Sequence, residues 1–423
     1  MTLNNPRCII HCNKHIFSSL IRVVLFLSLF FHPPVVFAAQ EPTDDSQQVF
    51  APEEAGDFTH IINSVLGKDP SIFYTSPLKE STAEFASGSS IQLGLGQKNN
   101  VLEDYNNFHD SVFSYISADV FFIWKNTNDR ELFISGYVEN TDYSDIYAEG
   151  AKQKIFALLK GETPVYVSSI IGIQLTLDYQ QSLDSLNTVS KNQLVPVVIN
   201  HEISVKPFWE KKIKREIYTI IEFEWSSNSA ELPDDSYEKA VLSAAVKKNY
   251  GFDSEFLMKY NTSRFTYEKA EALALDESPI VGTELVLDSH SIDLTSKHFW
   301  DQSKKWDLES SLGYKRQKDN GAGYDDFENY VLSETLQYKG IYWMLRGSIE
   351  LSNYLYGKRV VQVDGSKIES EYSHLIYIDI ELARSLGNGY SIITALKMNH
   401  STSNNKMEDY SYSSMIIKTE KLF

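Results

Sequence analysis

The sequence of 423 residues is acidic: 57 Asp and Glu against 39 Lys and Arg give a formal net charge of −18 at pH 7. This balance argues against a nucleic-acid-binding protein, whose contact surface is basic. The two cysteines, Cys8 and Cys12, lie near the N-terminus, so the rest of the chain does not rely on disulfides. No phosphate-loop, dinucleotide-binding, zinc-protease or Cys-x-x-Cys motif occurs, and we therefore predict no cofactor and no metal.

The first 38 residues are typical of a secretory signal peptide. Arg7, Lys14 and Arg22 form a basic region, and residues 23–31 (VVLFLSLFF) form an apolar core that is too short to span a bilayer. We predict cleavage after Ala38; a retained short membrane anchor is the alternative. Cleavage removes three basic residues and no acidic one, so the mature chain would carry a net charge of −21 instead of −18.

Residues 39–88 differ in composition from the rest of the chain. They begin with a stretch rich in Glu, Asp, Ser and Pro, and Phe58–Leu66 has the apolar spacing of a short amphipathic helix. We predict a short N-terminal segment on the periplasmic side. The sequence leaves three arrangements open for it: a loosely ordered tail, a helix packed on the following domain, and a plug inside that domain.

From Ser89 onward, apolar and polar residues alternate in many short stretches. In Ile341–Leu351 (IYWMLRGSIEL) the odd positions are apolar, whereas the even positions include Arg346 and Glu350. This period of two predicts a β-strand with two unlike faces. A tight turn precedes the strand, a polar stretch follows it, and the same unit recurs along the chain. We therefore predict an all-β fold, a transmembrane antiparallel β-barrel over residues 89–423.

The predicted barrel has about 16 strands, and 14 or 18 would also be acceptable. Residues 146–159 are the least certain strand, because the same stretch can be read as a helix. The expected strands are residues 91–96, 112–124, 132–138, 146–159, 165–179, 194–205, 217–225, 237–248, 252–260, 285–294, 306–314, 327–338, 341–351, 372–382, 392–398 and 410–423.

The predicted connections alternate between tight turns and longer polar linkers. This alternation is typical of bacterial barrels, which have short periplasmic turns and longer extracellular loops, and it places both chain ends in the periplasm. The longest loop is expected at Asn261–Gly282, with a helix-like apolar run at Ala270–Leu275. Tight turns are expected near Asn126, Glu162, Pro207, Tyr250, Asp301, Lys339 and Gly387.

Two sequence features resemble a known class. Aromatic residues gather at the strand ends, and the chain stops after an alternating segment at Phe423 in the sequence KTEKLF. This end is similar to the terminal signature of Gram-negative outer-membrane β-barrel proteins, although Glu420 and Lys421 lie unusually close to it. The resemblance implies an integral outer-membrane location among its lipids, with Phe423 read by the barrel-assembly machinery. Ser-Asn pairs beside aromatics, as at Ser352–Tyr354, also look like those of porin-like barrels that export a surface polymer.

The predicted inner faces of the strands carry more acids than bases. A ring of carboxylates in a narrow aqueous passage attracts cations and repels anions, so we predict a cation-preferring lumen. A solvated or salt-bridged lumen without a transport role is the alternative. The charged residues predicted to face the lumen are Asp119, Asp178, Glu222, Glu224, Asp253, Glu255, Lys259, Asp307, Glu309, Arg346, Glu350, Asp379, Glu381 and Lys397.

The sequence favours a passive channel for small solutes or for an exported polymer, because a barrel of this size can hold an aqueous channel. The alternative is a non-conducting surface barrel that acts in adhesion, binding of a surface ligand or envelope structure. A receptor of about 22 strands with a plug domain is too large for this chain.

Enzymatic activity is not predicted. Three stretches combine Ser or Asp with His: residues 109–111, residues 288–291 and His400-Ser401. None has the flanking pattern of a nucleophile motif, and each is a common combination of loop residues. His201 lies among outward apolar residues and is expected at the membrane interface.

Overall fold

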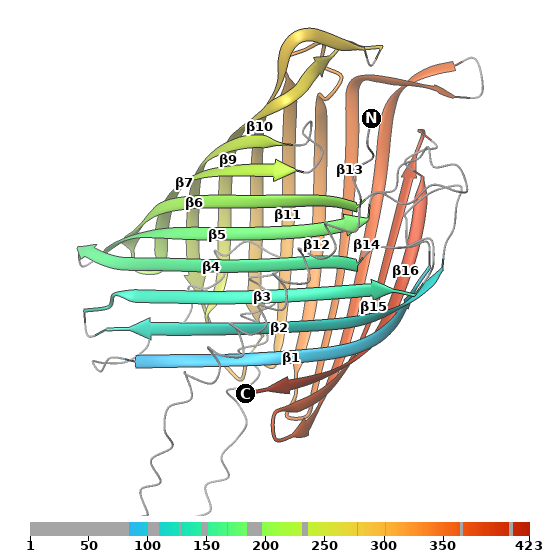
Figure 1. Cartoon of the computed structure of the whole chain (residues 1–423). Coiled ribbons are helices and arrows are strands. Elements are labelled where there is room, and N and C mark those ends of the chain that lie inside the picture. Colours follow the sequence, from blue (N-terminus) through green and yellow to red (C-terminus); the bar gives the residue numbers. More distant parts are fainter. Residues whose placement is uncertain are drawn as a thin grey trace, which may run out of the picture. The chain divides into compact units, whose positions relative to one another are not determined.

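The computed structural model describes residues 84–99, 110–126, 128–144, 151–166, 168–183, 197–230, 236–276, 278–300, 302–363, 367–405 and 409–423. These residues form sixteen antiparallel strands that close into one barrel (Figure 1). Each strand pairs with its neighbours in sequence, and the first strand pairs with the last. The strands are β1 (Glu84–Lys98), β2 (Ser111–Lys125), β3 (Glu131–Tyr143), β4 (Ala151–Tyr166), β5 (Ser169–Leu183), β6 (Val197–Lys214), β7 (Ile217–Ala230), β8 (Tyr237–Tyr250), β9 (Ser254–Leu273), β10 (Pro279–Phe299), β11 (Trp306–Asp319), β12 (Phe327–Lys339), β13 (Trp343–Val363), β14 (Lys367–Gly387), β15 (Tyr390–Ser403) and β16 (Tyr410–Leu422).

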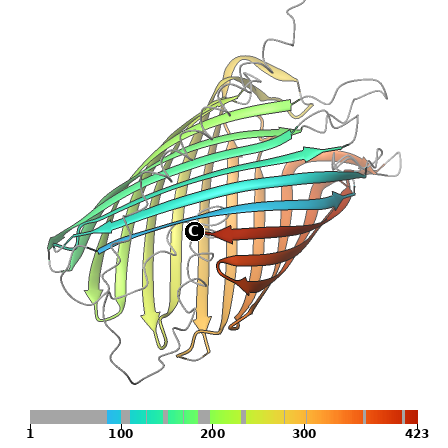
Figure 2. The same cartoon turned by 60° about the horizontal axis from the view of Figure 1, so that its bottom comes forward.

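The predicted fold class and the predicted number of strands are confirmed. The uncertain stretch at residues 146–159 contributes a strand, β4, rather than a helix. Figure 2 shows β1 beside β16, where the barrel closes. The N-terminal segment and the signal peptide lie outside the described residues, apart from Glu84–Gly88, which belong to β1.

Two predicted tight turns are wrong, because the strands run straight through them. Strand β4 continues past Glu162 to Tyr166, and β6 continues past Pro207 to Lys214. Proline has no N–H to donate to a sheet. The chain accommodates it because the pairs between β6 and β7 skip from Val205 to Phe208, while the register on either side stays the same. The sequence showed the proline but not this gap in the pairing.

The long loop predicted at Asn261–Gly282 is also wrong. Residues 261–273 continue β9 and residues 279–284 begin β10, so the connection is only the short tip between them. Figure 1 shows this hairpin, and the β13–β14 hairpin, reaching beyond the neighbouring strands. The predicted helix-like run is strand at Ala270–Leu273, where Ala272 is fully buried beside Leu285 and Leu287. The register of β9 and β10 shifts in this hairpin, so its apolar and polar residues do not alternate regularly as in the other strands.

The two faces of the barrel differ sharply in chemistry. On β2, Val112, Ile116, Val120 and Trp124 are exposed on the outside, whereas Asp119 between them is buried on the inside. The same alternation places exposed aliphatic side chains around the outer surface. An apolar surface this continuous requires a lipid solvent. In the described part of the chain, no helix is long and apolar enough to cross a bilayer.

Aromatic side chains border this apolar surface on both sides. The rings of Trp306 and Tyr338 lie 4.6 Å apart near the short turns, and those of Tyr314 and Tyr330 lie 5.1 Å apart further along the same strands. Aromatic girdles mark the two membrane–water interfaces of such barrels. In bacterial barrels the short turns and both chain ends lie on the periplasmic side, so we call the side of the short turns the periplasmic side and the opposite side the exterior.

Arginine at Ile173, on the outer face of β5, should prevent insertion of the barrel. A charge near the bilayer midplane of a barrel costs about 2–4 kcal/mol for arginine, which is a large part of a typical folding free energy. We expect the amount of folded Ile173→Arg protein in the outer membrane to fall sharply. Arginine at Thr176, on the inner face of the same strand, is the matched control and should leave the yield near normal. Equal yields for both variants would contradict the assigned faces.

Candidate functional site in the barrel lumen

The inner wall carries most of the charges that the sequence placed there. Strand alternation and register put thirteen of the fourteen predicted charged residues on the inner face of the barrel. They come from eight strands and therefore line the lumen all the way round rather than forming one cluster. These residues are Asp119, Asp178, Glu222, Glu224, Glu255, Lys259, Asp307, Glu309, Arg346, Glu350, Asp379, Glu381 and Lys397.

Asp253 is the exception and lies outside the wall. The predicted strand began at Phe252, whereas β9 begins at Ser254. Asp253 therefore belongs to the turn between β8 and β9, where its φ is 62°. Its carboxylate pairs with the Lys304 ammonium of the neighbouring turn. The prediction that Asp253 faces the lumen is therefore wrong: its charge lies at the periplasmic rim.

Lysines pair with many of the inner acids. Lys259 Nζ lies 2.8 Å from Glu222 Oε2, and Lys239 Nζ lies 3.1 Å from Glu224 Oε1. Such ion pairs cancel charge locally and reduce the field that an ion in the lumen experiences. The alternation that indicated the acids also places these lysines, of which the sequence predicted only Lys259 to face the lumen. Further pairs join Lys160 to Glu162, Lys247 to Glu210, Lys154 to Asp178 and Lys339 to Asp307.

Among the described residues, carboxylates that form no ion pair with a lysine lie near the closure of the barrel. Asp119 on β2 accepts a hydrogen bond from the Ser90 hydroxyl, and Glu420 on β16 accepts one of 2.9 Å from Gln92 Nε2. Glu420 lies within electrostatic range of both Asp119 and Glu381, with Lys418 nearby. We call Asp119, Glu381 and Glu420 the seam carboxylates. Within the described residues, no group of His, Cys, Asp and Glu is arranged to hold a metal ion.

A polar pocket of about 340 Å³ opens in the wall of β5 to β9, toward the exterior. Its donors and acceptors are of mixed type, and the Tyr237 and Tyr267 rings lie 5.6 Å apart on one side. Such a surface offers hydrogen bonds and aromatic contact to a polar solute. The lining residues are Asp178, Gln180, Asn200, Glu202, Asn228, Tyr237 and Tyr267.

The extracellular connection between β11 and β12 is held in one conformation. The Asp319 carboxylate accepts backbone hydrogen bonds from Gly321 (3.0 Å), Gly323 (2.8 Å) and Asp325 (2.8 Å). Arg359 from β13 pairs with Asp325 at 3.2 Å and stacks on the Tyr324 and Tyr356 rings, each 4.3 Å away. The connection therefore forms a fixed part of the outer rim.

The inner wall also has an apolar patch near the periplasmic ends of β2 to β4. Phe121, Phe133 and Leu158 are buried against one another, with Ile123 and Phe156 packed beside them. The sequence analysis missed this patch, because it followed the charged members of the inner faces and not the apolar ones. An apolar patch on an aqueous wall is a place where another apolar group can bind.

The residues that resembled enzyme motifs do not converge in the described chain. Asp288 and His290 point outward, where Asp288 pairs with Arg264 at 2.8 Å and His290 Nδ1 lies 2.9 Å from the Tyr260 hydroxyl. Ser289 and Ser291 lie on the opposite face of the same strand. His400 also faces outward, 3.1 Å from the Thr402 hydroxyl. His109 lies outside the described residues.

Comparison with known proteins finds no matching family model and no matching curated sequence. The chain is similar in structure to OccAB1 of Acinetobacter baumannii (9% identity, TM-score 0.42, covering 80% of this chain and 96% of that one). It is also similar to the loop L8 deletion mutant of OmpT, an outer membrane protein of Vibrio cholerae (10%, 0.41, 81% and 100%), and to the outer membrane protein OpdK of Pseudomonas aeruginosa (11%, 0.41, 80% and 99%). Similarities this distant carry no argument about activity.

The class of the protein follows from its own architecture. A closed antiparallel barrel with an apolar outer band, aromatic borders and a polar inner wall is the architecture of outer-membrane β-barrel proteins. The chain has this architecture, and its apolar outer band fits a lipid bilayer.

Alanine at Asp319 should loosen the rim without affecting the barrel. The carboxylate accepts three backbone N–H bonds, and a hydrogen bond to a charged group contributes about 1.5–3 kcal/mol. We expect hydrogen exchange at the amides of Gly321, Gly323 and Asp325 to accelerate by about 10- to 100-fold. Asp276→Ala, at the tip of the β9–β10 hairpin, should leave these amides unchanged. Equal exchange in Asp319→Ala and the unmodified protein would rule out the carboxylate as the anchor of the loop.

Proposed function

We propose that the protein is a passive channel for small polar solutes across the outer membrane. One observation carries this proposal: sixteen strands close around an inner wall of paired charges, amides, hydroxyls and tyrosines, while the outer wall is apolar. A barrel of this size is wide enough for an aqueous passage. Solutes move by diffusion, and no residue needs to carry out a chemical step.

The proposed selectivity is a modest preference for cations. The ion pairs formed by Glu222 and Glu224 with Lys259 and Lys239 leave little net field in their part of the wall. Two of the seam carboxylates, Asp119 and Glu420, accept hydrogen bonds from neutral groups instead, so they attract cations passing through the lumen. The polar pocket of β5 to β9 offers transient hydrogen bonds to polar solutes as they diffuse through the lumen.

Export and assembly complete the proposal. Residues 1–38 act as a cleaved signal peptide, and Phe423 is the residue that the barrel-assembly machinery reads. The backbone N–H of Phe423 donates a hydrogen bond of 2.9 Å to Ser89 O at the closure of the barrel, while its side chain is exposed. The phenyl ring of Phe423 is therefore free to be recognised by the assembly machinery before β16 pairs with β1.

The experiment is single-channel recording of the purified protein in a planar bilayer with a salt gradient. We expect stable conductance steps and a reversal potential whose sign shows that cations pass more readily than anions. In Asp119→Asn/Glu420→Gln the reversal potential should move toward zero, because two unpaired acids are removed from the wall.

The matched control is Glu222→Gln/Lys259→Gln, which removes one acid and one base that pair with each other. Its reversal potential should equal that of the unmodified protein. A change in the control as large as that in the seam variant would contradict the assignment of selectivity to the seam carboxylates.

A folded protein that passes no current would overturn the channel and favour a closed surface barrel. The apolar patch of Phe121, Phe133 and Leu158 is the specific observation behind this second candidate, because it can seat an apolar plug. Deletion of residues 40–83, which end directly before β1, would then distinguish the two. Current in the deletion variant alone would identify the N-terminal segment as the plug.

A further inference from the structure

An ionisable side chain faces the membrane near the middle of the outer surface. Glu334 on β12 lies on the outer face between Leu332 and Leu336, whose exposed side chains belong to the apolar band. Its cross-strand neighbours on this face are Ser310 of β11 and Ile349 of β13. Both register and alternation therefore point the Glu334 carboxylate away from the lumen.

The depth of Glu334 follows from the aromatic borders on the same strands. Along β12, Glu334 is midway between Tyr330, which packs on Tyr314, and Tyr338, which packs on Trp306. An outward-facing charged pair on the same two strands lies at a different depth. Arg316 and Glu328 lie beyond Tyr314 and Tyr330, toward the exterior. Glu334 is thus inside the apolar band and not at its border.

A carboxylate at this depth has few partners. The Ser310 hydroxyl donates to Glu334 Oε2 at 2.6 Å, and among the described residues Oε1 has no hydrogen bond. Lipid tails contain no donors, so an ionisable group facing them destabilises a barrel and usually marks a functional contact. A surface that satisfies Oε1 must therefore come from outside this chain's own barrel.

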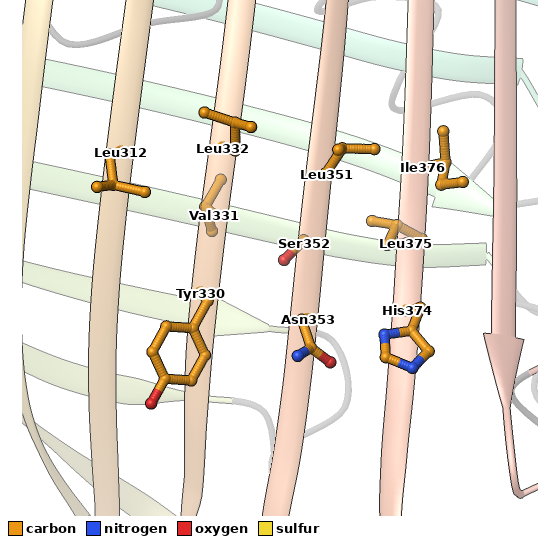
Figure 3. A pocket seen from close by; sticks show the side chains of 10 residues that line it. All are labelled: Leu312, Tyr330, Val331, Leu332, Leu351, Ser352, Asn353, His374, Leu375 and Ile376. Atoms are coloured by element: carbon orange, nitrogen blue, oxygen red, sulfur yellow. The ribbon is translucent and has the colours of Figure 1, made fainter.

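The surroundings of Glu334 allow such a surface to approach closely. Ser296 of β10 is the cross-strand neighbour of Ser310, and at Gly347 of β13 no heavy atom lies within 4 Å of the position that a Cβ would take. We call Ser296, Ser310, Glu334 and Gly347 the midplane patch. The adjoining groove has a volume of about 360 Å³. In Figure 3, four of the side chains that line it, Leu312, Leu332, Leu351 and Ile376, form one row.

We propose that the midplane patch is the contact between two copies of this chain. In a two-fold contact the same surface meets itself, so it must supply its own donors and acceptors. The patch can do so: Glu334 Oε1 is the acceptor, and the Ser296 hydroxyl can donate when it accepts from the Tyr250 hydroxyl 3.3 Å away, since either of these two hydroxyls can be the donor. Aliphatic side chains of each copy fill the groove of the other. This inference does not depend on the channel function.

The test is disulfide cross-linking in native outer membranes. Ile349→Cys, beside Glu334, is introduced into a Cys8→Ser/Cys12→Ser chain, which contains no other cysteine. Oxidation should yield a covalent dimer. Ile173→Cys, on the outer face of distant β5, is the matched control and should stay monomeric. A yield at Ile349→Cys no higher than at Ile173→Cys, or cross-linking only to a protein of another mass, would overturn the proposal.

Substitution of the carboxylate gives the second readout. Glu334→Leu should fold, as shown by heat-modifiable gel mobility, because it extends the apolar band. In the Ile349→Cys background it should lower the dimer yield at least tenfold, since the acceptor is lost. Glu334→Gln keeps an acceptor and should retain most of the yield. An unchanged yield in folded Glu334→Leu would show that the carboxylate does not hold a partner copy.

Discussion

The closure of β1 on β16 is the constraint on which the rest of the structure depends. Ser90–Lys98 pair in register with residues 414–422, and the Phe423 N–H extends the ladder to Ser89 O. Within lipid, an open sheet edge would leave backbone N–H and C=O groups without partners, at several kcal/mol each. Closure satisfies them, and it requires an unbroken ladder of strands from β1 to β16.

The same closure determines the chemistry of the lumen. In β1, Ser90 and Gln92 face inward, and the register with β2 and β16 brings them against Asp119 and Glu420. Those two acids accept hydrogen bonds from neutral donors, and neither forms a lysine ion pair among the described residues, although Lys418 lies near Glu420. Elsewhere on the wall, for example at Glu222 and Lys259, neighbouring strands bring opposite charges together. The charge preference proposed for the lumen therefore depends on the acids at the closure of β1 on β16 more than on the total number of acids in the wall.

Sequence alternation predicted the faces of β2 and β7 correctly, because a strand inside the membrane has one wet and one lipid-facing side. It failed for residues 261–282, where the hairpin extends beyond the neighbouring strands, its register shifts, and the regular alternation disappears. It also failed at Pro207, since the interrupted pairing that accommodates the proline is a property of two strands and not of one.

The functional site was less predictable than the fold, for related reasons. Alternation places a charge on a face but does not show its partner, so the pairing of Glu224 with Lys239 required the register. Likewise, the outward position of Glu334 follows from its strand alone, but its depth between two aromatic borders follows only from the neighbouring strands.

The most direct test of a water-filled lumen with this register is cysteine labelling along β7. Single variants Glu222→Cys, Phe223→Cys, Glu224→Cys and Trp225→Cys, in the chain without Cys8 and Cys12, are treated in the outer membrane with a small, membrane-impermeant maleimide. The structure predicts labelling at positions 222 and 224 and none at 223 and 225. Labelling of all four positions, or of none, would contradict an aqueous passage enclosed by this barrel.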